Sequence, residues 1–87
     1  MERRREQRLP ASGPVELWIE RPEGGNVVGE LVDISPSGFR IRHSDLSIRT
    51  GMRVRYSHSA GSGAALVAWT RVVGQQVESG FYIPGAG

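Results

Sequence analysis

Apolar and polar residues alternate along most of this chain, in short segments that glycine and proline separate. In the first segment, Val15, Leu17 and Ile19 alternate with charged or aromatic neighbours. A period of two is typical of a β-strand with one buried and one exposed face. The repeated pattern therefore predicts a sheet of short strands and gives no convincing helix.

The same pattern, applied to the whole chain, predicts six strands. In the second strand, Val28, Val32 and Ile34 are expected on the buried face, and Asp33 and Ser35 together on the other face. Six short strands favour a small antiparallel β-barrel, because closure removes exposed sheet edges. The predicted strands span residues 15–20, 27–35, 39–42, 52–56, 64–73 and 77–83, with a loop at 44–51 that includes up to one helical turn and a glycine- and serine-rich turn at 57–63.

The length of 87 residues predicts one small domain, which buries only about 60% of the surface that its unfolded chain exposes. We expect an arginine-rich arm at residues 1–10 and the barrel at 14–84. The chain has no cysteine, which excludes disulfides and thiolate metal sites. His43 and His58 have no metal-ligand spacing and are expected on the surface at strand ends, so no metal is predicted.

No segment approaches the roughly 20 apolar residues of a membrane span, and no apolar stretch follows the N-terminal charges. We therefore expect a cytoplasmic protein. The net charge is only +2, yet all eleven cationic residues are arginine, and four of them lie within the first eight residues. Such a terminal cluster is usually a solvated basic arm, but it can also hold an anion.

Two short motifs suggest which anion. Arg4 and Arg8 lie four residues apart, and Asp33, Ser35 and Gly38 follow as Asp-x-Ser-x-x-Gly. Guanidinium groups pair with phosphate oxygens and with the O6 and N7 edge of guanine. An ionised Asp33 accepts the N–H donors of guanine, and the Ser35 hydroxyl donates or accepts. Gly38, with no Cβ, is expected to take a positive φ in the turn and to leave room for a base or phosphate.

In order and separation, the two motifs resemble those of the PilZ domain, a bacterial receptor module for the second messenger cyclic di-GMP (c-di-GMP). The resemblance covers the chain from the arginine arm to Phe81. It implies a PilZ-like barrel of the split-barrel type with a flexible N-terminal arm. It also implies that Arg4 and Arg8 contact phosphate and guanine, while Asp33, Ser35 and Gly38 complete the base site. Motility, exopolysaccharide synthesis and biofilm formation are the processes that the family implies.

The resemblance adds two further candidate ligand residues. Trp69 is similar to a family tryptophan that can stack on a base, although a partly buried barrel residue is an equal alternative. Arg3 precedes the first motif arginine, and an arginine there implies a stacked pair of ligands on each chain. Arg5 has no assignment. Many relatives carry a C-terminal helix over the barrel, whereas this chain stops at Gly87, so a homo-oligomer is expected to cover part of the exterior.

Three classes of function remain open on the sequence. The favoured one is a c-di-GMP receptor that orders its arm on ligand binding and signals to an unidentified effector protein. The first alternative is a PilZ-like adaptor that docks proteins without nucleotide. The second is a single-stranded nucleic-acid-binding barrel, which the low net charge and the acidic Glu16 and Glu20 on the first strand disfavour, so no DNA partner is predicted. The sequence shows no nucleophile, acid–base pair or metal group that predicts an enzyme, and no cofactor beyond the ligand.

Overall fold

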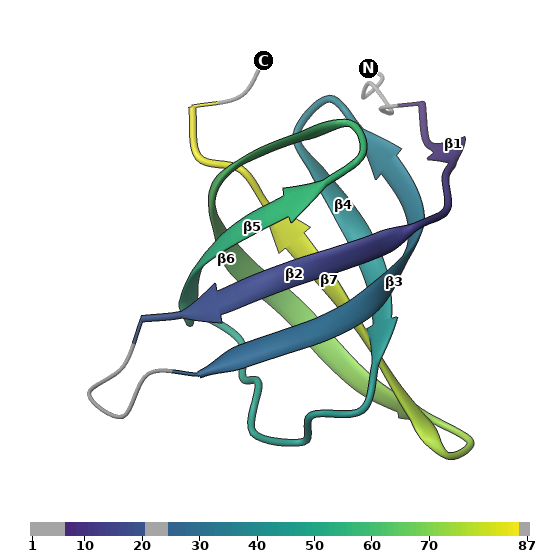
Figure 1. Cartoon of the computed structure of the whole chain (residues 1–87), viewed down its shortest axis with the longest axis vertical. Coiled ribbons are helices and arrows are strands. Elements are labelled where there is room, and N and C mark those ends of the chain that lie inside the picture. The colour runs from purple at the N-terminus through teal and green to yellow at the C-terminus, as the bar shows by residue number, and fades with distance from the viewer. Residues whose placement is uncertain (1–6, 21–24, 86–87) are drawn as a thin grey trace, which may run out of the picture.

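The alternating segments fold into antiparallel strands whose apolar faces meet inside a barrel (Figure 1). The computed structural model describes residues 7–20 and 25–85, and these contain no helix. Within these two ranges there is accordingly no helix of the length and apolarity that crossing a membrane requires. The strands are β1 (Leu9–Pro10), β2 (Pro14–Ile19), β3 (Asn26–Ser35), β4 (Gly38–His43), β5 (Arg53–His58), β6 (Gly61–Val73) and β7 (Gln76–Tyr82).

The strand order is β1-β3-β2-β5-β6-β7-β4, and a further pairing of β3 with β4 closes the sheet. Six strands therefore form a closed antiparallel barrel, as predicted, and β1 is an additional short strand on the edge of β3. Around this barrel, β2 and β5 lie on the side opposite β4 and β7. The outer surface consequently has two separate faces, each made by its own strands.

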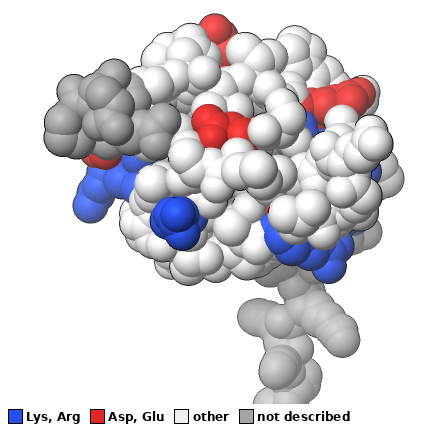
Figure 2. All heavy atoms as spheres, turned by 90° about the horizontal axis from the view of Figure 1, so that it is seen from below, with Lys and Arg blue, Asp and Glu red and all other residues white. Residues whose placement is uncertain are grey.

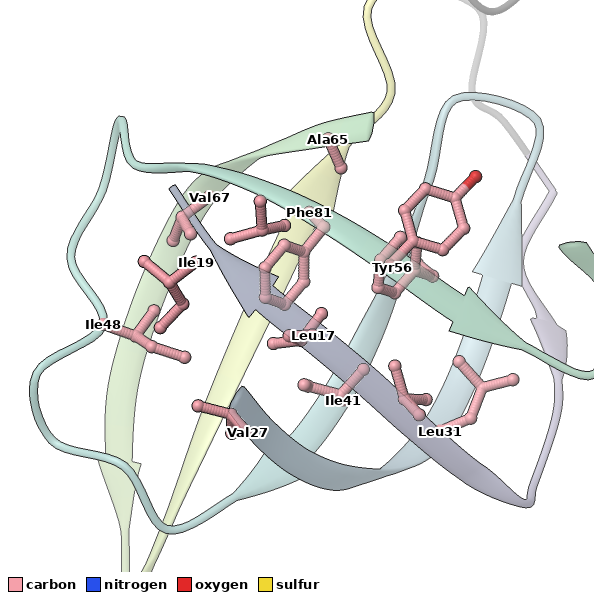
Figure 3. Packing of buried hydrophobic residues seen from close by; sticks show 13 residues of the cluster. Leu17, Ile19, Val27, Leu31, Ile41, Ile48, Tyr56, Ala65, Val67 and Phe81 are labelled. Atoms are coloured by element: carbon pink, nitrogen blue, oxygen red, sulfur yellow. The ribbon is translucent and has the colours of Figure 1, made fainter. Parts of the chain in front are cut away.

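The core is a single cluster inside the barrel, where side chains from opposite walls point toward one another (Figure 3). Phe39 lies at its centre and stacks on Phe81 with ring centroids 4.9 Å apart, and it also meets Tyr56 at 4.6 Å. Burial of these large side chains supplies most of the stabilisation available to so small a domain. The other buried members are Val15, Leu17, Ile19, Val27, Leu31, Ile41, Ile48, Val54, Ala65 and Val67.

The predicted face of the second strand is wrong at its beginning. Val28 is 62% exposed, whereas Val27 and Leu31 are buried. The pairing of β3 with β4 shifts register between Leu31 and Asp33, as expected of a β-bulge. Beyond the bulge the predicted alternation holds, because Ile34 packs against the core.

Two segments carry more strand than predicted. Residues 57–63 do not form one long turn, because His58 already pairs with Gly61 across a tight β5–β6 hairpin. The last two residues of the predicted arm, Leu9 and Pro10, also form a strand, which pairs with Ile34 and Asp33 of the barrel. Paired backbone in both segments satisfies peptide groups that a loop would leave to water. The loop at 44–51 contains no helical turn.

Candidate functional site

The Asp-x-Ser-x-x-Gly motif occupies the hairpin that joins β3 to β4. Ser35 and Gly38 are paired across this hairpin, and Asp33 pairs with Arg40. Because Ile34 packs on the core, Asp33 and Ser35 both face outward, as the sequence predicts. The Ser35 hydroxyl lies 3.5 Å from the Gly38 carbonyl oxygen, so that contact is long and leaves the hydroxyl able to bind elsewhere.

Gly38 is required for a different reason from the predicted one. Its φ is not positive. A Cβ built on Gly38 would lie 1.9 Å from the carbonyl oxygen of Phe81 on the neighbouring strand β7. The residue therefore allows close backbone approach in the sheet, and the expected left-handed turn conformation is wrong.

Asp33 lies between two arginines that come from different parts of the chain. Arg8, just before β1, donates from Nη1 to Asp33 Oδ1 at 2.7 Å, and Arg40 on β4 donates from Nη2 to Oδ2. The Asp33 side chain is only 9% exposed. Each carboxylate oxygen has more than one lone pair, so the group can accept further N–H donors while both arginines hold it.

Trp69 lies on the same outer face, on β6. Its indole covers Gly80 of β7 so closely that a Cβ there would lie 2.2 Å from Nε1. The guanidinium carbon of Arg71 is 5.3 Å from the centre of the indole ring, within the range of a cation–π contact. The indole is half-buried, and its exposed part is a surface on which a flat base can stack.

Two β-bulges place Asp33 and Trp69 on this face. The register of β6 against β7 shifts between Val67 and Trp69, just as β3 shifts before Asp33. Val67 and Leu31 point into the core, so strict alternation would have turned Trp69 and Asp33 inward as well. Each bulge instead turns the next side chain outward, an effect that is common beside functional sites.

A second carboxylate, Glu78 on β7, also lies between two arginines. Arg71 Nη2 donates to its Oε1 at 3.0 Å, and Arg42 Nη2 to its Oε2 at 3.4 Å. These contacts, the hydrogen bond from Arg71 foremost, lower the pKa of Glu78 although burial opposes them. Glu78 is therefore ionised at neutral pH.

The predicted ligand residues are thus brought together only in part. Arg8 contacts Asp33, and Ser35 and Gly38 lie beside them. A hollow of about 330 Å³ lies at this edge, where Ser35 and its neighbours Gln7, Leu9, Ile34 and Pro36 line it. Trp69 shares the face but is separated from Asp33 by β4 and β7. Arg3, Arg4 and Arg5 lie outside the described residues.

Four charged residues of this face were not predicted as ligand residues: Arg40, Arg42, Arg71 and Glu78. A sequence signal existed for the first two, since their alternation with Phe39 and Ile41 predicts a cationic outer side of that strand. The position of Glu78 depends on its pairing with β4, whose Arg42 is 36 residues away in the sequence, as well as with the adjacent strand β6. No local pattern reports the pairing with β4.

His43 contradicts its predicted place on the surface, because it is 4% exposed. Its Nδ1 accepts the backbone N–H of Asp45 at 3.0 Å, so Nε2 carries the proton and donates to Ser79 Oγ at 2.7 Å. Ser79 Oγ in turn donates to Thr70 Oγ1 at 2.9 Å. Burial lowers the pKa of His43 and keeps it neutral in this chain of hydrogen bonds, while Asp45 opposes that effect.

His58 is half-buried rather than free at the surface. Its ring stacks on Tyr56 and meets the edge of Phe39, at centroid distances of 5.1 and 4.9 Å. Burial lowers the pKa of this histidine as well. Among the residues that the structure describes, no three histidine, aspartate or glutamate side chains gather in a way that could hold a metal ion.

Comparison with known proteins agrees with this architecture. A sequence profile of the PilZ domain matches residues 2–85. The chain therefore belongs to the PilZ domain family. Among solved structures it is similar to the PilZ domain with c-di-GMP of YcgR from Escherichia coli, with a TM-score of 0.65 and 16% sequence identity over 97% of this chain and 79% of that one. A search of curated proteins finds no match.

Proposed function

We propose that this PilZ domain is a receptor for c-di-GMP, which it binds on the outer face of β3, β4, β7 and β6. One observation carries the proposal. Arg8 of the first motif is held against Asp33 of the second, beside Ser35 and Gly38, in a chain of the PilZ family. The solved relative YcgR, whose PilZ domain was determined with c-di-GMP, supports the choice of ligand.

The residues have complementary roles in this proposal. Arg8, with Arg4 from the preceding segment, contacts phosphate and the acceptor edge of guanine, while Asp33 accepts the guanine N–H donors. Ser35 adds a hydroxyl, and Gly38, which lets β4 lie close to β7, keeps the hairpin that carries Asp33 and Ser35 in place. Trp69 provides a stacking surface, a contact worth about 1–3 kcal/mol per base in nucleic-acid complexes. An arginine at position 3 favours a stacked pair of ligands.

Signalling is proposed to depend on ordering of the arm. The positive charges of Arg3, Arg4, Arg5 and Arg8 repel one another, and ligand phosphates remove this repulsion. Because Leu9 and Pro10 pair with β3 and Arg8 already contacts Asp33, we expect the change in the residues before Arg8. NMR relaxation of the arm, measured with and without c-di-GMP, tests this step, and equal rigidity in both states contradicts it. The ordered arm would then present a surface to an effector protein.

Calorimetric titration of c-di-GMP into the purified chain tests the receptor function, with GTP as a competing guanine nucleotide. We expect saturable binding to the wild type and loss of binding in Arg8→Ala and Asp33→Ala. Arg55→Ala is the matched control, because Arg55 is an exposed arginine on β5, on the opposite side of the barrel. Binding that survives in both site variants, or that GTP displaces equally well, contradicts the proposal.

The adaptor alternative predicts no heat with any cyclic dinucleotide and an interaction with protein alone. The nucleic-acid alternative needs a continuous cationic surface along which a backbone can run. Figure 2, which views the barrel from the end that carries the β6–β7 turn, shows basic and acidic residues scattered among uncharged ones. Among the described residues visible at this end, the basic ones form no continuous track for a long strand.

A further inference from the structure

The outer face carries the same arrangement twice. Asp33 lies between Arg8 and Arg40, and Glu78 lies between Arg42 and Arg71. Both carboxylate side chains are 9% exposed, and all four arginines are more exposed than the acid they hold. The family motifs account for the first arrangement and leave the second without a role.

The registers place Trp69 beside the Glu78 arrangement, at the far end of the cross-strand row that begins with Asp33. Gly80 pairs with Arg40 on one side and with Trp69 on the other, while Glu78 pairs with Arg42 and Arg71. Asp33 on β3 and Glu78 on β7 are two strand spacings and about two residues of rise apart, with β4 between them, which puts their Cα atoms roughly 12 Å apart. One purine cannot reach both carboxylates at that separation, whereas the two bases of a dinucleotide can.

The chemistry of the second cluster is selective for guanine. A carboxylate accepts the N1–H and N2–H₂ donors of guanine, and an adjacent guanidinium donates to O6 and N7. Adenine has an acceptor at N1 and an amino group at C6, so it meets a carboxylate and a guanidinium with the wrong polarity. The four guanidinium groups and two carboxylates of the two clusters leave a net charge of +2, which balances the two phosphates of one cyclic dinucleotide.

We propose that Glu78, with Arg42 and Arg71, forms a second guanine site, which reads the base that stacks on Trp69 while Asp33 reads the other base. The inference depends on the proposed c-di-GMP binding and adds a residue-specific source of base selectivity. Arg71 has two tasks in this site, because it holds Glu78 and also lies against the Trp69 ring.

The test compares three ligands, namely c-di-GMP, the mixed cyclic guanosine–adenosine dinucleotide and cyclic di-AMP. In the wild type, each guanine replaced by adenine should weaken binding about tenfold or more, the value of one charge-assisted hydrogen bond. In Glu78→Gln, c-di-GMP and the mixed ligand should bind within about threefold of each other, because a glutamine side chain can pair with adenine. Cyclic di-AMP should remain weak, because Asp33 still selects guanine.

Glu20→Gln is the matched control. Glu20 lies 3.7 Å from Arg53 in an ion pair on the opposite side of the barrel, so this variant should keep the wild-type ratios. If Glu78→Gln does not fold, Arg71→Gln takes its place, since Arg71 is 61% exposed. That variant should also reduce the ratio of the affinity for c-di-GMP to the affinity for the mixed ligand. A wild-type preference for c-di-GMP over the mixed ligand in the folded variant overturns the inference. Absence of c-di-GMP binding by the wild type is a distinct result, which overturns the proposed function as well.

Discussion

The Asp33 and Glu78 clusters have the same composition but different origins in the chain. Arg8 reaches Asp33 from the segment before the barrel, whereas both partners of Glu78 come from barrel strands. The Glu78 cluster is therefore fixed by the same pairing that closes the barrel. The Asp33 cluster also depends on how the arm is docked, which makes it the one that can couple ligand binding to the arm.

The largest expected difference between the two clusters is in stability, when the glycine beside each one, Gly38 or Gly80, is replaced by alanine. Gly38→Ala forces a Cβ against the Phe81 backbone, which cannot move without disturbing β7, so we expect a loss of about 3 kcal/mol or more of unfolding free energy. In Gly80→Ala the three atoms nearest the new Cβ all belong to the Trp69 indole, and rotation of that side chain should limit the loss to about 1 kcal/mol. Urea unfolding of both variants measures the two losses. Equal losses would show that the indole is held as firmly as the backbone.

Removal of the charge on Asp33 tests how much the Asp33 cluster contributes to the affinity for c-di-GMP. Asp33→Asn keeps the shape of the side chain but puts an amide donor where guanine also donates, so the affinity for c-di-GMP should fall about 10- to 150-fold, equivalent to about 1.5–3 kcal/mol. Calorimetry measures the change against wild type, with Glu20→Gln as the control. An unchanged affinity would remove Asp33 from the site.

The two arginines of β4 provide a more closely matched pair, since they lie two residues apart on one strand. Arg40 makes the shorter contact, and Arg42 lies 3.4 Å from Glu78. Arg40→Gln should therefore weaken c-di-GMP binding by roughly tenfold and Arg42→Gln by only a few fold. The reverse order would indicate that the Glu78 cluster dominates the binding of the ligand.

The smallest expected effects are on stability in acid, where the buried histidines and Glu78 on the outer face should respond in different pH ranges. The folded-state pKa values of His43 and His58 are lowered from 6.5, so the unfolded chain binds more protons and stability should fall as the pH drops below 6.5. The pKa of Glu78 is lowered from 4.5, so its contribution is present above that pH and is lost in more acidic solution. His43→Gln should reduce the loss of stability below pH 6.5, and Glu78→Gln should reduce the loss in more acidic solution than pH 4.5. Thermal unfolding measured across the pH range checks both. A loss below pH 6.5 that His43→Gln leaves unchanged would assign it to other groups.

Much of the fold could be predicted because alternation reports burial directly. Val15, Leu17 and Ile19 face inward as predicted, and so do Phe39 and Ile41. Val28 was assigned to the wrong face because the alternation changes phase at the bulge before Asp33, and the sequence does not mark that bulge. Asp33 and Ser35 were nevertheless predicted correctly to share a face, since both follow the bulge.

The candidate site was predictable where its residues form a local motif and not where they meet through the sheet. Asp33, Ser35 and Gly38 lie within one hairpin, so their spacing carried the prediction. Glu78 meets Arg42 across β4 and β7, and His43 meets Ser79 across the same pair of strands. These contacts depend on register, which is set by the whole barrel.

The two tryptophans offer the most direct test of where the ligand binds. Trp69 lies on the outer face of the two clusters, beside the Glu78 cluster, and Trp18, which is 41% exposed, lies on β2 on the opposite side of the barrel. Their indole N–H signals can be followed in one nitrogen-15 NMR titration with c-di-GMP. We predict that the Trp69 signal shifts saturably while the Trp18 signal stays in place. A saturable shift of Trp18 alone, or no shift of Trp69 at saturating ligand, would contradict binding on this face.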